Sequence, residues 1–194
     1  MERVCRKKVL IILAVFVGCY AGSLSQVFAQ ADGKSPESQV KVLARSYPTP
    51  EKLACFLNER LVFERDSSLF GRSDYWQRPE EFLANGAGDC EDYALLAQAV
   101  LEQQGKEAFL FSLYGTKGYA HTVCVFVENS RYNVMNEGRL LRYQAESLEE
   151  LADRLYSSWD WAAIAVERGH RGCALKKIYN PARRPLPRGE RLPL

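Results

Sequence analysis

The sequence predicts an α+β domain in which helices precede a group of antiparallel strands. An apolar stripe with helical spacing begins at Cys90 and ends near Gly105. The short polar turn Glu128-Asn129-Ser130 joins two strand-like segments into an antiparallel hairpin. Helices followed by a run of strands, without regular alternation of the two, are typical of the α+β class. The segments with strand-like composition are 108–114, 121–127 and 131–136.

The composition indicates one globular domain. The chain has 194 residues, of which 47% are hydrophobic and 26% charged, enough for a sizeable core. The net charge of +2 indicates no polyanionic partner, and many basic residues lie near the two ends, so we expect no nucleic-acid binding. Six irregularly spaced cysteines without a C-x-x-C pair, and only two histidines, argue against a disulfide framework and a structural zinc site.

Residues 1–29 are predicted to be an export signal or a membrane or lipid anchor. Basic residues precede the uncharged run Val9–Val17, which is short for a membrane span. Three interpretations remain open: cleavage between Ala29 and Gln30, lipidation of Cys19 as in a lipoprotein, or an uncleaved anchor. Each places the domain outside the cytoplasm, in the periplasm or the envelope of a bacterium, and the last two attach it to a membrane.

The remaining chain divides into three parts. Residues 30–48 are polar and are predicted to form a flexible lead-in. Residues 49–179 are predicted to form the folded domain. The tail 180–194 contains four prolines and four arginines, a composition that predicts disorder.

Three helices besides the Cys90 helix are expected. Thr49-Pro50-Glu51 combines a capping residue with proline at the first helical position, and Cys55 is placed on the apolar face of that helix. A loop over 65–74 leads to a short helix at 78–83. Ser147–Tyr156 begins with a capping box. The segment 159–166 fits a helix or a strand, and 168–172 is predicted to be a polar turn that leaves His170 in solvent.

Cys90 is the candidate nucleophile. A thiol at a helix N-terminus faces the positive end of the helix dipole, which favours the thiolate. The alternative is that Cys90 is a small buried apolar residue, as most free cysteines are. Cys124 is expected in the core, and a disulfide among Cys55, Cys124 and Cys173 stays open.

A thiolate nucleophile needs a base and a group that orients the base, and His121 is the plausible base. A two-residue loop at Glu128-Asn129 places Asn136 opposite His121, whereas longer loops place Glu137 or Gly138 there. Asn136 therefore stays within about two residues of that position in each register. Its side-chain oxygen is expected to accept the Nδ1–H of His121 and to fix the tautomer.

These residues resemble a known family. Trp76-Gln77-x-Pro79, the block Gly88 to Ala94, Ala120-His121 and the segment Tyr132 to Asn136 are similar to the transglutaminase-like cysteine protease superfamily, in particular to its exported bacterial branch. The resemblance covers residues 49 to about 140. It implies a papain-like core in which the helix that bears the nucleophile packs on an antiparallel sheet.

The resemblance also implies roles for residues. Cys90 would be the nucleophile, His121 the base and Asn136 the orienting residue, although the family usually has Asp at the third position. Some exported members bind calcium through carboxylates that flank the nucleophile, here Asp89 and Glu91. Negative charge beside the thiol raises its pKa, and a bound cation would offset this effect. The same acids also complement the helix dipole. No other cofactor is required.

Three functions are compatible with this site. The first is an exported cysteine peptidase that cleaves a protein or peptide amide in the cell envelope through an acyl-enzyme. The oxyanion would be stabilised by the Cys90 backbone N–H, with Gln77 as a further candidate donor and Trp76 as part of the substrate cleft. The second is a protein-glutamine acyltransferase with the same site. The third is a degenerate binding module of the envelope without catalysis.

Overall fold

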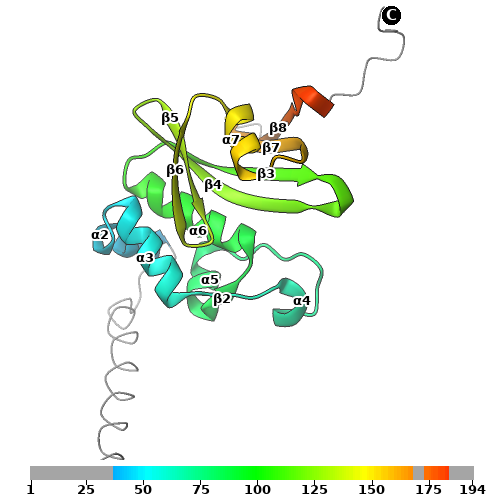
Figure 1. Cartoon of the computed structure of the whole chain (residues 1–194). Helices are drawn as coiled ribbons and strands as arrows, with labels where there is room; N and C mark the ends of the chain where they lie inside the picture. The colour runs from blue at the N-terminus through cyan, green and yellow to red at the C-terminus, as the bar shows by residue number, and fades with distance from the viewer. Residues whose placement is uncertain (1–36, 168–172, 184–194) are drawn as a thin grey trace, which may run out of the picture. The chain divides into compact units, whose positions relative to one another are not determined.

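An antiparallel sheet is the centre of the computed structural model, which describes residues 37–167 and 173–183 (Figure 1). Six of the described strands pair in the order β6-β5-β4-β3-β7-β8. All neighbours in this sheet are antiparallel. The strands are β3 (Ala108–Gly115), β4 (Ala120–Glu128), β5 (Arg131–Asn136), β6 (Arg139–Ala145), β7 (Trp159–Glu167) and β8 (Cys173–Tyr179).

Helices cover both faces of this sheet, and the described residues from Val40 onward belong to one compact unit. Helix α6 (Cys90–Gln103) packs on one face and α7 (Leu148–Leu155) on the other (Figure 1). Because side chains alternate along a strand, Phe126 belongs to the α6 core and Val125 to the α7 core. The predicted α+β class, with the Cys90 helix on an antiparallel sheet, is confirmed.

Capping side chains determine where two of the predicted helices begin. Thr49 Oγ1 accepts a first-turn backbone N–H of α3 (Pro50–Arg60) at 3.3 Å. Ser147 Oγ accepts the N–H of Glu150 at 3.1 Å at the start of α7. The Glu150 carboxylate bonds the backbone of Glu146 and not that of Ser147, so only half of the predicted capping box is present.

The β4–β5 hairpin sets the register next to His121. Asn129 and Ser130 form the turn, with φ of 51° and 58°, the left-handed values of a type I′ turn. Glu128 therefore pairs with Arg131, which is not the register of the predicted Glu128-Asn129 loop. Continued along both strands, the observed register places Asn136 two residues before the position opposite His121. An offset of two leaves both residues on the same face.

A second tight turn, between β5 and β6, is seated on α3. Glu137 and Gly138 form it, with φ of 47° and 78°, and Asn136 pairs with Arg139 across it. A Cβ at Gly138 would lie 2.8 Å from the backbone nitrogen of Asn58 in α3. Only glycine tolerates both this φ and this close approach, so the turn and α3 are fixed against each other.

A small parallel strand pair holds the loop that leads to Cys90. Strand β1 (Val62–Phe63) pairs with β2 (Ala87–Gly88). The predicted short helix is α5 (Pro79–Asn85). The segment 65–74, predicted to be a loop, contains the one-turn helix α4 (Asp66–Leu69).

The structure differs from the predicted domain limits at both ends. The sequence predicts a flexible lead-in up to residue 48, but Glu37–Ser46 forms helix α2. Val40, Leu43 and Ala44 are buried in the α6 core, because their spacing forms an apolar stripe on one helix face. At the other end, Asn180 is buried and its Nδ2 donates to the Trp159 carbonyl at 2.8 Å, so it belongs to the domain.

Strands β6 and β8 were not predicted, and β7 resolves the ambiguous segment 159–166. Cys55 is exposed, so its predicted core position is wrong, whereas Cys124 is buried as expected. Both are free thiols. The export signal, the turn with His170 and the tail after residue 183 lie outside the described residues. Among the helices that the structure describes, none is long and apolar enough to cross a membrane.

Candidate active site

Cys90 is the first residue of α6, in a position fixed by its neighbours. Asp89 is the N-cap, and its side chain and that of Asp92 form a complete capping box. The Cys90 thiol is half-buried and donates to Glu91 Oε2 at 3.1 Å. It also accepts a hydrogen bond from the backbone of Thr122. The thiol therefore lies at the start of β4, beside the residue that follows His121.

His121 and Asn136 are hydrogen-bonded across the hairpin. The ring Nε2 of His121 lies 2.9 Å from Asn136 Oδ1. The sequence predicted that Nδ1 would face Asn136, and this detail is wrong. Because Nε2 is engaged, Nδ1 is the nitrogen left for other partners, and Glu137 Oε1 lies 3.8 Å from it.

Tyr119 lies near both His121 and Cys90. Its ring centroid is 6.3 Å from that of His121 and 3.9 Å from that of Tyr156, on which it stacks. Burial raises the pKa of Tyr119, and the nearby groups Tyr156, Cys90 and Glu137 raise it further by their charge. The sequence did not single out Tyr119, although it lies two residues before His121.

The environment of the Cys90 thiol favours its protonated form. Burial raises the pKa of Cys90 to about 12, and the hydrogen bond to Glu91 and the charges of Glu91 and Asp89 add to the rise, against the opposing Thr122 hydrogen bond. Burial and the flanking acids therefore oppose the thiolate that the helix N-terminus is expected to favour. The expected effect of the flanking acids on the thiol is confirmed in direction.

Gln77 has a structural role beneath the site. It is 0% exposed, and its Nε2 donates to Asp92 Oδ2 at 2.6 Å and to the Ala87 carbonyl at 3.0 Å. Its Oε1 accepts from Asn85 Nδ2 at 2.7 Å. Both amide hydrogens are thus engaged, which argues against the predicted oxyanion contact. A Cβ at Gly88 would lie 2.2 Å from Asp92 Oδ2, so this glycine is needed for close packing.

Trp76, the other residue predicted for substrate contact, is 45% exposed. Its indole Nε1 donates to Asp74 Oδ1 at 3.0 Å. The side chain therefore presents an aromatic face to solvent next to a group of acids.

These acids come from distant segments and converge beside Cys90. The ligand atoms of Asp66, Asp89 and Asp92 lie within 4.8 Å of one another, as do those of Asp66, Asp74 and Glu91. Asp66 Oδ1 and Asp89 Oδ1 are buried without a hydrogen-bond partner among the described residues. Burial raises the pKa of Glu91 to about 8, and a hydrogen bond with Asp89 contributes. The predicted Asp89 and Glu91 are brought together. Asp66 and Asp74 were missed because the segment 65–74 has no distinctive sequence pattern.

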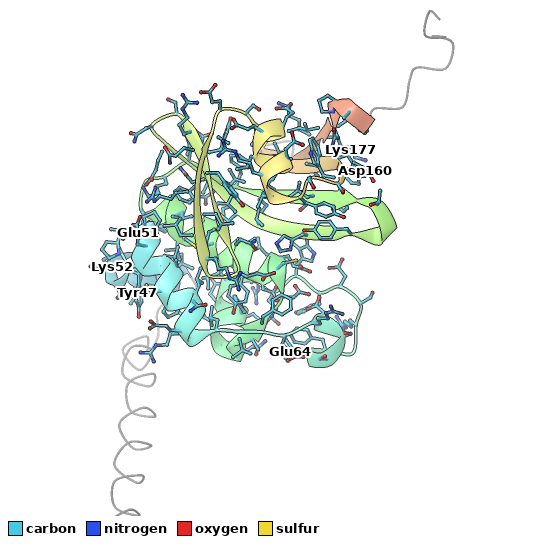
Figure 2. The ribbon with its side chains drawn as sticks, in the orientation of Figure 1. Tyr47, Glu51, Lys52, Glu64, Asp160 and Lys177 are labelled. Atoms are coloured by element: carbon cyan, nitrogen blue, oxygen red, sulfur yellow. The ribbon has the colours of Figure 1, made fainter. Side chains whose placement is uncertain are left out.

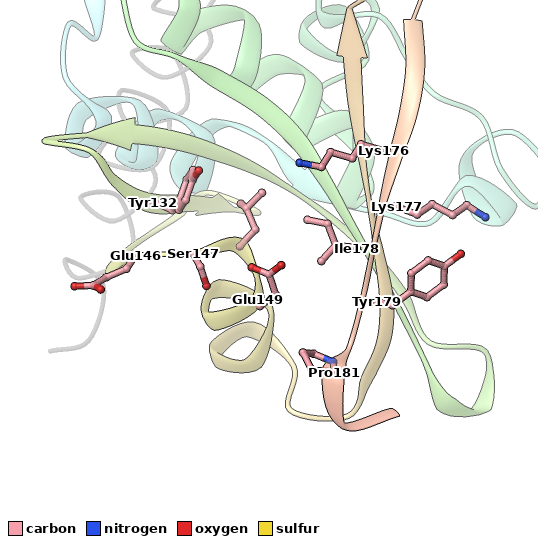
Figure 3. Close-up of a pocket in the computed structure, with 10 residues that line it drawn as sticks. Tyr132, Glu146, Ser147, Glu149, Lys176, Lys177, Ile178, Tyr179 and Pro181 are labelled. Atoms are coloured by element: carbon pink, nitrogen blue, oxygen red, sulfur yellow. The ribbon is translucent and has the colours of Figure 1, made fainter. Parts of the chain in front are cut away.

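A cavity of about 670 Å³ lies on the α7 face of the sheet, between α7 and β8. Lys176 and Glu149 are among the charged residues that line it (Figure 3). None of its lining residues belongs to the Cys90 site, so it is separate from the candidate chemistry.

A thiol on the first turn of a helix, packed on a sheet whose neighbouring strands carry a bonded histidine and asparagine, is the arrangement of a transglutaminase-like cysteine peptidase. The sequence profile of the bacterial transglutaminase-like cysteine proteinases matches residues 29–135, more than half of the chain. The chain belongs to this family, and it is a transglutaminase-like cysteine peptidase.

Solved structures give matches of lower identity. Calcium-bound LapG from Legionella pneumophila is 21% identical with a TM-score of 0.45, and the match covers 72% of this chain and 82% of LapG. EGTA-treated LapG from the same organism is 20% identical with a TM-score of 0.44, covering 77% and 88% of the two chains. A comparison with curated protein sequences gave no match.

Proposed function

We propose that this protein is an exported peptidase that hydrolyses an amide bond of a protein or peptide in the bacterial envelope. Cys90 is the nucleophile, His121 the general acid and base, and Asn136 the residue that orients His121. The observation that carries the proposal is the 2.9 Å contact between His121 Nε2 and Asn136 Oδ1. This contact leaves Nδ1 facing away from Asn136. The next residue of the same strand, Thr122, donates its backbone N–H to the Cys90 thiol, which supports a role for Cys90 and His121 in one site.

The reaction proceeds in two stages. Proton transfer from Cys90 to His121 produces the nucleophile, and Sγ attacks the scissile carbonyl carbon. The imidazolium then donates its proton to the leaving amine, and the C–N bond breaks to give a thioester. In the second stage His121 takes a proton from water, and the hydroxide attacks the thioester carbon. The C–S bond then breaks, the acid product leaves, and the imidazolium returns its proton to the Cys90 sulfur.

The start of α6 supplies one donor to the oxyanion. Backbone N–H groups of the first helical turn lack partners within the helix. We assign the N–H of Cys90 as a donor to the carbonyl oxygen on which negative charge develops during the attack.

The acid cluster fits a calcium ion. Asp66, Asp89 and Glu91 offer hard oxygen ligands, and two of their oxygens are buried without a partner among the described residues. A cation would offset the negative charge that, with burial, raises the pKa of Glu91. When bound, calcium supplies positive charge that stabilises these carboxylates and lowers the pKa of a neighbouring thiol. Asp92 is already saturated by Gln77 and by the Asp89 backbone.

Export rests on the N-terminal sequence, where basic residues precede the uncharged run Val9–Val17. Cell fractionation would place the protein in the periplasm or the membrane fraction. The mass of its mature N-terminus would distinguish cleavage before Gln30 from a lipid-modified Cys19.

The test compares bacteria that express the wild type with bacteria that express Cys90→Ala. Proteins released from the envelope are identified by mass spectrometry. We expect at least one protein to be released only by the wild type, and Cys55→Ala, which removes an exposed thiol on α3, to release it as well. The same release by Cys90→Ala and the wild type would refute the proposal. A labelled amine in the product would indicate acyl transfer in place of hydrolysis.

A further inference from the structure

The partner of His121 Nε2 is the uncharged amide of Asn136. The amide oxygen of Asn136 accepts a hydrogen bond and fixes the tautomer of the ring. A neutral amide, however, stabilises the imidazolium form less than a carboxylate does. A carboxylate elsewhere near the ring would therefore add stabilisation of the imidazolium that the amide does not supply.

Glu137 places a carboxylate on the opposite nitrogen of the same ring. Its Oε1 lies 3.8 Å from His121 Nδ1, and both side chains are partly shielded from solvent. Glu137 directly follows Asn136, and its φ of 47° turns its side chain toward the ring where a regular strand would send it to the other face. One two-residue stretch thus contacts both ring nitrogens.

The turn that carries Glu137 is held in place from outside the sheet. Gly138 contacts the α3 backbone so closely that a Cβ would lie 2.8 Å from Asn58 N and 3.0 Å from Asn58 Cα. Figure 1 shows the β5–β6 hairpin reaching toward α3 and α6. The Glu137 carboxylate is therefore presented by a fixed turn.

Two other described neighbours of His121 are uncharged side chains. Tyr119 lies 6.3 Å away between ring centroids, and Leu113 is its neighbour on β3. From α6, Cys90 bonds the backbone of Thr122, and Tyr93 is close enough to Glu137 for that charge to raise the pKa of its phenol.

We propose that Glu137 is a positioning residue for His121. Its carboxylate supplies negative charge beside the ring, which the neutral amide of Asn136 does not supply. The inference rests on the proposed function, because it assigns Glu137 a role in the same reaction. It predicts that most of the activity is kept when the charge is moved from Glu137 to position 136.

The first readout is independent of any substrate. The ring proton signals of His121 are followed by NMR against pH and assigned with His121→Gln, because the chain has only two histidines. Glu137→Gln keeps the shape of the side chain and should lower the midpoint of the His121 signals, because the carboxylate 3.8 Å from Nδ1 is replaced by a neutral amide. Adding Asn136→Asp should restore the midpoint.

The second readout is the pH profile of kcat/KM on the protein identified by the Cys90→Ala comparison. Glu137→Gln should lower kcat/KM about five- to tenfold and shift both limbs of the profile to lower pH. The double variant with Asn136→Asp should recover most of the loss. Glu107→Gln removes the same charge from an exposed residue just before β3, at the end of that strand far from Leu113 and His121, and should change neither readout.

An unchanged His121 midpoint in Glu137→Gln, or a double variant that stays as impaired as Glu137→Gln, would overturn the inference. The proposed function can fail separately. In that case Cys90→Ala behaves as the wild type in the release experiment, whatever the NMR titration shows.

Discussion

At the scale of single residues, Gln77 shows how a buried amide can set the geometry of a loop. Its backbone N–H and side-chain Nε2 both donate to the Asp92 carboxylate, at 2.8 Å and 2.6 Å. The same carboxylate accepts the Asp89 N–H at 3.1 Å. Asp92 thereby connects the segment before α5 to the N-cap of the helix that begins with Cys90.

Gln77→Ala should therefore destabilise the protein. The substitution takes one of two donors from the buried Asp92 Oδ2, which keeps the Asp89 N–H, and it removes the Gln77 partner of the Ala87 carbonyl and of the Asn85 amide. We expect a cost of roughly 2–4 kcal/mol in the free energy of unfolding. Urea denaturation followed by fluorescence measures this. Gln98→Ala, which removes an exposed amide bonded to Glu102 on α6, should change the free energy by less than about 0.5 kcal/mol. A catalytic defect in Gln77→Ala with unchanged stability would restore the oxyanion hypothesis.

The Cys90 thiol should respond to both pH and calcium. Burial and the Glu91 hydrogen bond raise its pKa to about 12, so in EGTA the thiolate is scarce at pH 7 and alkylation by iodoacetamide accelerates as the pH rises. Calcium on the flanking carboxylates should lower that pKa and accelerate alkylation at pH 7 about tenfold or more.

Cys55 serves as an internal control for this measurement, because it is an exposed thiol on α3. Mass spectrometry of peptides quantifies both sites in one sample. Equal acceleration of Cys55 and Cys90, or no calcium effect on Cys90, would contradict the prediction.

At the scale of elements, the β5–β6 turn joins the sheet to α3 and carries two of the residues around His121. Gly138→Ala should cost more than the φ of 78° alone requires, because its Cβ would also overlap the backbone of Asn58. We expect a loss of roughly 2–4 kcal/mol in the free energy of unfolding, from strain and overpacking together.

Gly105→Ala is the matched control for the turn. Gly105 has the same φ of 78°, but nothing lies within 4 Å of an added Cβ. It should cost only the strain of the left-handed conformation, about 1 kcal/mol. Equal losses in the two variants, measured by urea denaturation, would show that the contact with α3 contributes nothing.

The elements that were predicted have local patterns, and those that were missed do not. Thr49-Pro50 and the stripe from Cys90 identify helices from a few residues. Strand β6 contains Arg139 and Arg142, and β8 contains Lys176 and Lys177. Both are edge strands, where charged residues protect the sheet from pairing with other chains, and this obscures the alternation that marks a strand.

The residues of the candidate site could likewise be predicted only where they belong to a local sequence pattern. Cys90, His121 and Asn136 follow from motif and hairpin register, which are local properties. The position of Glu137 depends on which two residues form the β5–β6 turn. The sequence does not determine this, because the length of the preceding β4–β5 loop left the register open. Asp66 approaches Asp89 only through the fold of the intervening segments, so no spacing in the sequence indicates it.

At the scale of the whole molecule, charge pairs connect distant segments around the sheet. Arg142 of β6 bonds Glu51 of α3 and Glu128 of β4, and Lys106 also bonds Glu128 (Figure 2 labels Glu51). These pairs are partly exposed, so each contributes little alone. The acid cluster is different, because it gathers like charges from α4 and from the start of α6, and only a cation or protons can stabilise it.

Calcium should therefore stabilise the whole domain. A ligand at 100 times its Kd adds about 2.7 kcal/mol to the free energy of unfolding, which corresponds to a rise in Tm of roughly 5–10 °C for a domain of this size. Thermal unfolding in calcium and in EGTA measures the shift. Magnesium should give a smaller one, because it demands a tighter, octahedral set of ligands.

The variant Asp66→Asn distinguishes two hypotheses: that calcium stabilises the acid cluster, or that protonation of its carboxyl groups does. Burial raises the pKa of Asp66, and the charges of Asp89 and Asp74 raise it further, so the neutral amide should leave Tm in EGTA unchanged or higher. The same variant loses a carboxylate ligand and should lose most of the calcium-dependent rise, whereas Glu107→Gln should keep all of it. If the wild type melts at the same temperature in calcium and in EGTA, protons alone stabilise the cluster, and the thiol of Cys90 must be activated by His121 without help from a cation.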